Sequence, residues 1–99
     1  PSVTKVGGVT EILKVIALAE AYGVALVPHC PYFGPGLLAS LHLLGTMGDE
    51  VYAEFLYYDS LEASPYGDAV VPVNGVMNLP EMPGLGMDPD PHVLADYGA

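Results

Sequence analysis

His29 and Cys30 are the first candidates for chemistry in this sequence, because they follow an apolar run and open a Pro/Gly-rich loop (VPHCPYFGPG, 27–36). A cysteine that is activated by a histidine forms a nucleophilic pair. Neighbours in an extended segment point to opposite faces, however, so these two side chains are not expected to act on each other. We therefore interpret Cys30 as a small buried residue. His29 stays open as an acid–base group or a packed histidine.

Two further motifs resemble ligand-binding loops but favour plain turns. Lys5-Val6-Gly7-Gly8 precedes a predicted helix and could bind an anion at its N-terminus, but no complete phosphate motif is present. Lys5 would suit catalysis only if burial lowered its pKa. In Asp88-Pro-Asp90-Pro-His92, the prolines oppose the wrapped geometry that calcium needs, and no glutamate follows at the required spacing.

The remaining candidates lie within or at the end of predicted elements. His42 is surrounded by leucines in a predicted helix, which favours a packed or surface histidine. Tyr57, Tyr58 and Asp59 end an apolar segment. They could line the mouth of a pocket, or they could make core and capping contacts.

Two helices are expected to position these side chains. Apolar residues recur at helical spacing over residues 11–22 and again over residues 36–45. Thr10 is the expected N-cap of the first helix, and Gly23 is the residue expected to end it.

Strands are expected before, between and after these two helices, at residues 1–6, 24–28 and 53–58. Residues 24–28 (VALVP) are continuously apolar, as is typical of a parallel strand buried on both faces. Pro28 cannot donate to a ladder and should end that strand. The alternation of strand and helix predicts an α/β fold with parallel strands and right-handed crossovers.

The chain after Asp59 differs in composition, because prolines recur at short intervals and break regular secondary structure. Residues 69–73 and 75–80 surround Asn74-Gly75, a type I′ turn signal, and predict a short hairpin. A short helix is predicted near residues 91–97.

Composition limits the partners of the chain. It has 99 residues, of which 52% are hydrophobic, and a net charge of −10. Residues 49–99 carry ten carboxylates and no Lys or Arg, so nucleic acid and anionic membranes are not expected as partners. The acidity either gives solubility or complements basic groups elsewhere.

The single cysteine favours a reducing, cytoplasmic compartment. Because the chain starts at Pro1 without a signal-like region, we expect a soluble piece of something larger.

Four stretches together resemble the mandelate racemase / muconate lactonizing enzyme family of the enolase superfamily. They are PSVTKVGGVTEILKVIALAEAYGVALVPH, PYFGPGLLASLHL, EFLYYD and NLPEMPGLGMDPD, and the resemblance covers essentially all 99 residues in order. It implies a C-terminal fragment of a modified TIM (β/α) barrel with an α+β capping domain. Residues 1–59 would then be the last β/α units, and residues 60–99 the segment that returns to the cap.

The resemblance also implies an activity and a site. The family abstracts a proton next to a substrate carboxylate with the help of Mg²⁺, whose acidic ligands lie on barrel strands that precede this sequence, so no metal ligand is assigned here. His29 matches the histidine that ends the seventh strand, a general base in one subgroup. The aspartate that pairs with it falls on Ser2, and the lysine of other subgroups is absent there too. The usual histidine–aspartate pair is thus absent, and His29 is expected to lack a charged partner because Ser2 supplies no charge. The family's eighth-strand acid would fall near residues 56–59, and Glu54 lies at the wrong end of its strand to match it.

We therefore expect part of a Mg²⁺-dependent racemase or dehydratase that acts on hydroxy or sugar acids. The substrate would be a small carboxylate, with His29 as the catalytic residue and Ser2, Tyr32, Tyr57 and Asp59 as substrate contacts. The other expected partners are the missing N-terminal part of the parent chain and, in a homo-oligomer, further copies of it. The chain alone should be inactive. The alternatives are a non-catalytic βαβ binding or interaction module of 99 residues and a family member with a purely structural role.

Overall fold

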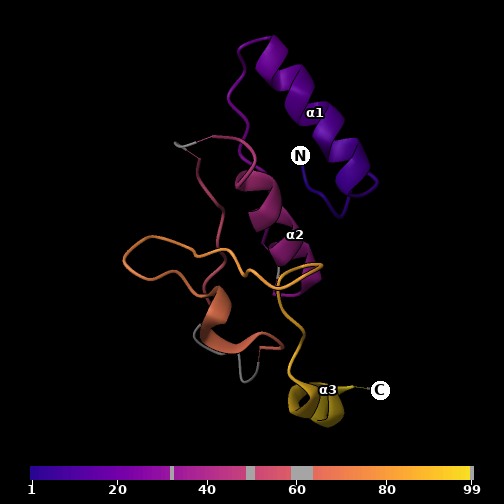
Figure 1. Cartoon of the computed structure of the whole chain (residues 1–99), viewed down its shortest axis with the longest axis vertical. Coiled ribbons are helices and arrows are strands. Elements are labelled where there is room, and N and C mark those ends of the chain that lie inside the picture. The colour runs from indigo at the N-terminus through magenta and orange to yellow at the C-terminus, as the bar shows by residue number, and fades with distance from the viewer. Residues whose placement is uncertain (32, 49–50, 59–63, 99) are drawn as a thin grey trace.

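A computed structural model describes residues 1–31, 33–48, 51–58 and 64–98 of the chain. These residues form three α-helices and one 3-10 helix: α1 (Val9–Ala21), α2 (Pro35–Leu44), η1 (Gly67–Val70) and α3 (Pro91–Tyr97). Helices α1 and α2 contact each other, whereas α3 lies at the opposite end of the molecule from α1 (Figure 1). The three predicted α-helices are therefore present, each within two residues of its expected bounds.

Helix α1 begins two residues earlier than expected. Its N-cap is Gly8, which makes no side-chain capping bond, so the prediction of Thr10 as the cap is wrong. Gly7 and Gly8 have φ values of +106° and +95°, which glycine adopts without strain. This double turn redirects the chain before Thr10 and lets the helix start at Val9.

The other end of α1 follows the prediction. Gly23 has a φ of +63°, and its N–H donates to Glu20 O at 3.0 Å. The Val24 N–H donates to Ala19 O at 2.8 Å. These two bonds form a Schellman motif, in which a glycine in the left-handed region closes the last turn.

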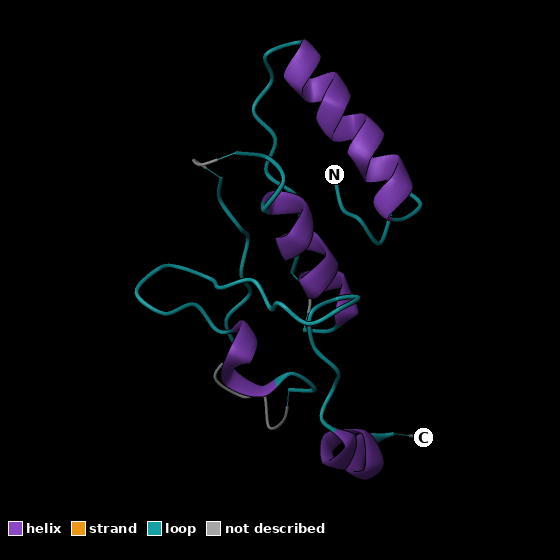
Figure 2. Ribbon diagram, viewed as in Figure 1, coloured by secondary structure: helices purple, strands orange, loops and turns teal. Residues whose placement is uncertain are grey.

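The predicted strands are not formed. No described residue belongs to a β-strand, and residues 24–31 and 51–58 follow loop backbone (Figure 2). A parallel strand needs a repeating set of backbone partners on its neighbours. Here the His29 N–H donates to Pro1 O at 2.8 Å, but the next N–H, from Cys30, goes to the Glu54 side chain at 3.0 Å. Residues 1, 29–30 and 54 thus lie close together without forming the repeated backbone hydrogen bonds of a β-sheet.

The tail contains the predicted turn but not the predicted hairpin. Asn74 and Gly75 have φ values of +52° and +78°, as a type I′ turn requires, and Val73 and Val76 form an isolated antiparallel bridge. The bridge does not extend into a hairpin, because residues 67–70, which precede it, form η1. Further on, the Asp90 side chain caps α3 by accepting from the His92 N–H at 2.8 Å. This contact identifies the Asp88–His92 motif as a turn and a helix cap.

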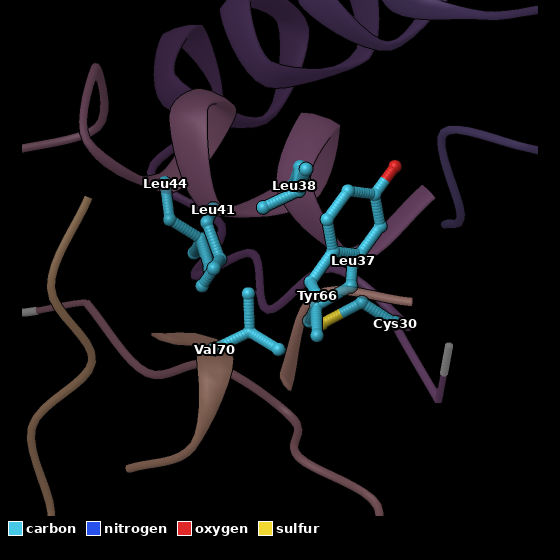
Figure 3. Packing of buried hydrophobic residues seen from close by; sticks show 7 residues of the cluster. All are labelled: Cys30, Leu37, Leu38, Leu41, Leu44, Tyr66 and Val70. Atoms are coloured by element: carbon cyan, nitrogen blue, oxygen red, sulfur yellow. The ribbon is translucent and has the colours of Figure 1, made fainter. Parts of the chain in front are cut away.

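The larger hydrophobic core is built around α2. One face of the helix packs against Cys30 and against two residues from beyond position 63 (Figure 3). The buried members of this cluster are Cys30, Leu37, Leu38, Leu41, Leu44, Tyr66 and Val70. A smaller cluster of Val3, Ile12 and Leu43 joins α1 to α2.

The molecule is elongated for its length. Its radius of gyration is 14.3 Å, against about 13 Å for a compact domain of this size. Large apolar side chains on α1 and on residues 51–58 remain exposed. Among the described helices, none is both long and apolar enough to cross a membrane.

Candidate active site

His29 lies directly after the buried Pro28, where the loop of residues 24–31 passes the N-terminal residue. Its backbone N–H donates to Pro1 O at 2.8 Å, which fixes the main chain at this point. The imidazole is neither packed among the leucines of the core nor fully in solvent: 48% of the His29 side chain is exposed. A half-exposed, anchored imidazole is suited to exchanging a proton with a small molecule.

The His29 ring has an acidic partner that the sequence did not predict. Nδ1 of His29 lies 2.8 Å from Oε2 of Glu54, and the same carboxylate oxygen accepts from the Cys30 N–H at 3.0 Å. The expectation that His29 lacks a charged partner is therefore wrong. It assumed a regular strand that would carry the Glu54 side chain away from the histidine, whereas residues 51–58 follow loop backbone.

Cys30 behaves as the buried residue that was expected. It has no exposed surface, while His29 next to it is exposed. Its thiol donates to the main-chain carbonyl of Glu54, with Sγ 3.0 Å from the oxygen. Burial raises the pKa of the Cys30 thiol above its ordinary value of 9.0, and the Glu54 charge adds to the rise, against opposing hydrogen bonds. A thiol in this state is a poor nucleophile near neutral pH.

Ser2 and Tyr57, two of the predicted substrate contacts, lie in different surroundings. Ser2 is buried, and its hydroxyl is 3.0 Å from that of Thr4. It follows Pro1, whose carbonyl holds the His29 backbone. Tyr57 is exposed. Tyr32 and Asp59 lie outside the described residues. A substrate role for these four residues stays a prediction.

Tyr57 lines an aromatic cavity of about 300 Å³ together with Phe33, Phe55 and Tyr58. The rings of Phe33 and Tyr58 meet edge to face, with centroids 5.8 Å apart. Neither His29 nor Glu54 lines this cavity. The structure therefore does not bring Tyr57 and His29 into one pocket.

Two other candidates have structural contacts. Lys5 is exposed in a turn, so it is not a buried lysine. Its backbone N–H donates to Ser2 O at 3.0 Å. His42 places Nε2 3.0 Å from Leu85 O, which ties α2 to the tail.

The described residues do not fit a Mg²⁺ site. In that part of the chain, no three His, Cys, Asp or Glu side chains gather closely enough to hold a metal ion. Mg²⁺ requires several oxygen ligands in near-octahedral geometry, usually with carboxylates among them. The expectation that the ligands lie elsewhere stays a prediction.

Glu54 is the site residue that the sequence reasoning missed. A signal was present, because Glu54 is the only charged residue in the otherwise apolar and aromatic run 51–58. Carboxylates are rarely placed in such runs unless they are paired.

Comparison with known proteins gives consistent matches over nearly the whole chain. A family model described as enolase C-terminal domain-like matches residues 1–93. An L-rhamnonate dehydratase of Saccharopolyspora erythraea is 36% identical over 100 residues, which cover 94% of this chain and 24% of that enzyme.

D-galactonate dehydratases of Ralstonia nicotianae and Ralstonia pickettii are each 36% identical over 98 residues, covering 91% of this chain and 25% of the enzyme. The chain thus spans about a quarter of the length of these relatives. No solved structure matches it.

Proposed function

Since this chain belongs to the enolase C-terminal domain-like family, we propose that it forms part of an enzyme that dehydrates sugar acids. The relatives are sugar-acid dehydratases, and the match to them includes the segment that carries His29. The observation that carries the proposal is the position of His29, half-exposed on an anchored main chain and paired with a carboxylate.

The reaction proposed is removal of the proton next to the substrate carboxylate, followed by loss of a hydroxyl group as water. This elimination takes one proton from carbon and gives one proton to the departing hydroxyl, which leaves as water. We assign one of these two transfers to His29. Glu54 accepts from Nδ1, so the proton would be exchanged with the substrate through Nε2.

The remaining parts of the proposal concern the complete enzyme. Residues 1–59 would form the last units of a modified TIM barrel, and residues 60–99 the segment that returns to the cap. The loop backbone at 24–31 and 51–58 would then gain its ladder partners from neighbouring strands. A Mg²⁺ requirement would be met by acidic ligands outside the described residues. Ser2, Tyr32, Tyr57 and Asp59 remain proposed substrate contacts.

The test is turnover by the complete enzyme, supplied with Mg²⁺, on a panel of sugar acids that includes L-rhamnonate and D-galactonate. Formation of a dehydrated keto acid is expected for at least one of them. His29→Asn should lower kcat by about 10²- to 10⁴-fold, the range that a positioned acid–base group contributes. The matched control is His92→Asn, which changes an exposed histidine on α3 and should leave kcat unchanged.

Three results would count against the proposal. Unchanged turnover by His29→Asn would remove the acid–base role. Racemisation without loss of water would identify a racemase. Absence of turnover on the whole panel would favour the non-catalytic binding module.

A further inference from the structure

We propose that Asn74 is a modification site, where the side-chain amide is lost spontaneously in the folded protein, and that the isoaspartate product loosens the surrounding turn from α2. This site is independent of the proposed dehydratase function. Asn74 and Gly75 lie exposed at the tip of a turn, with φ values of +52° and +78°. Asn74 is the only asparagine of the chain that is followed by glycine, since Asn78 precedes a leucine.

The reaction needs only the chain and water, and asparagine is among the thermolabile residues of proteins. The backbone nitrogen of Gly75 attacks the side-chain carbonyl carbon of Asn74 and closes a cyclic imide, while the amide nitrogen takes the Gly75 proton and leaves as ammonia. Water then opens the imide at one carbonyl or the other, which gives aspartate or isoaspartate. Glycine has no Cβ to crowd this approach. No hydrogen bond among the described residues engages the Gly75 N–H, so this nitrogen is available for the attack.

The bridge that closes the turn controls how often the attack can occur. The Val73 N–H donates to Val76 O at 2.8 Å, and the Val76 N–H donates to Val73 O at 3.0 Å. Closing the imide requires the main chain at Asn74 to rotate out of the type I′ conformation, so both bonds oppose it. The bridge is weak, however, because it is isolated and both valines are more than half exposed. Such a segment opens locally while the rest of the chain stays folded.

The isoaspartate product disturbs the contact between this turn and α2. It places an additional carbon in the main chain after position 74, and a two-residue turn cannot accept that carbon and keep the register of the bridge. Gly75 and Val76 line a cavity of about 450 Å³ together with Leu41 of α2, and Met77 packs against the larger hydrophobic core. A displaced turn therefore loses apolar contacts with α2, which should lower the free energy of unfolding.

The first experiment follows both amides in the complete protein during incubation in mildly alkaline buffer. Cleavage after glutamate releases residues 63–81, a peptide that carries both asparagines of the chain, and mass spectrometry with fragmentation measures the loss of each amide. The Asn74 amide should be lost, with isoaspartate among the products, while Asn78 stays intact. Asn78 is the matched control, because it is exposed in the same tail but is followed by leucine. Retention of both amides, or equal loss at the two positions, would overturn the proposal.

The second experiment separates the chemistry of glycine from the control by the bridge. In urea, where both chains are unfolded, Gly75→Ala should slow the loss of the Asn74 amide, a comparison that does not depend on the fold of the variant. Under native conditions the amide should be lost more slowly than in urea. Val76→Pro removes one bridge donor and should raise the native rate, whereas Val73→Ala keeps both backbone bonds and should not. Equal rates for wild type and Gly75→Ala in urea, or a native rate that Val76→Pro leaves unchanged, would overturn the proposal.

The third measurement tests the consequence for the fold. The isoaspartate form, separated from the unmodified protein by ion exchange, should unfold at a lower urea concentration than the wild type. Asn74→Asp adds the same charge without the additional main-chain carbon, so its midpoint should shift less. An isoaspartate form as stable as the wild type would overturn the loosening from α2. A shift of the same size in Asn74→Asp would also overturn it, because the charge alone would then account for the loss.

Discussion

Helices α1 and α2 are both rich in apolar residues, yet they differ sharply in burial. In α2, the residues with little or no exposed surface are Leu37, Leu38, Ser40, Leu41, Leu43 and Leu44. In α1, which is longer, Ile12 is the only buried residue. Leu13 and Leu18 of α1 are 44% and 60% exposed.

The difference arises from what surrounds each helix. One face of helix α2 packs against Cys30 and against Tyr66 and Val70 of the tail (Figure 3). Helix α1 shares with α2 only the smaller cluster of Val3, Ile12 and Leu43 among the described residues. The proposed site belongs to the α2 side, because Cys30 links that core to Glu54 and so to His29. Core packing and site geometry are therefore coupled around α2.

The comparison is tested most strongly by matched truncations of leucine. Leu38→Ala empties a site with no exposed surface and should lower the free energy of unfolding by about 2–5 kcal/mol. Leu18→Ala, on a side chain that is 60% exposed, should change it by less than about 0.5 kcal/mol. The measurement is urea denaturation of both variants and the wild type.

An equal cost for the two variants would contradict the contrast between the helices. It would show that the outer face of α1 is covered by other protein in solution. Repeating the denaturation at two protein concentrations shows whether a second copy of the chain covers α1, because only then does the unfolding transition depend on protein concentration.

A second, smaller effect concerns pH and is specific to the α2 core. Burial raises the pKa of the Cys30 thiol in the folded chain above its ordinary value of 9.0. The stability that comes from the neutral thiol is complete below the pKa of the unfolded chain, and it is lost as pH rises through the folded pKa. The free energy of unfolding should therefore decline above about pH 9 in the wild type.

Cys30→Ala supplies the control for this pH effect. It should remove the thiol's share of the decline, while its stability at neutral pH falls because of the lost packing. An identical decline above pH 9 in the variant would assign the effect to other groups, such as the tyrosines.

The smallest expected effect lies on the surface of α1. Lys14 Nζ and Glu11 Oε1 are 2.7 Å apart across one helical turn, with both side chains largely exposed. Glu11 also lies in the first turn, where a negative charge favours the helix. Glu11→Gln should lower the free energy of unfolding by roughly 0.5 kcal/mol. High salt should reduce the difference between variant and wild type, since exposed pairs are screened. A loss above about 2 kcal/mol would mean that the pair is not a surface pair.

Local signals predicted the helices well and the strands poorly. Helix periodicity, the glycine at position 23 and the Asn74-Gly75 turn each depend on residues close in sequence, and each was confirmed. The strand at 24–28 was predicted from apolar character alone. A strand also needs hydrogen-bonding partners from distant segments, and the backbone nitrogens of His29 and Cys30 found Pro1 O and the Glu54 side chain instead.

The candidate site divides in the same way. The type of residue 29 and its place between an apolar run and a Pro/Gly-rich loop marked it as a candidate, either an acid–base group or a packed histidine. The family resemblance then favoured the acid–base role of His29, which stays a prediction. Its partner was not predictable by those means, because the side chain of Glu54 is 25 residues away and reaches His29 only through the fold.

Several features can be predicted from neighbouring residues, because propensity, periodicity and charge act over a few positions. They are the order of the helices, the ends of the helices, the turn at 74–75, the excess of carboxylates and the choice of His29 as a candidate residue. Which helix is buried, which oxygen holds the imidazole, and how Cys30 joins the core to Glu54 depend on contacts between distant residues. Those contacts are chosen by packing and hydrogen-bond satisfaction across the whole fold, and only the three-dimensional structure specifies them.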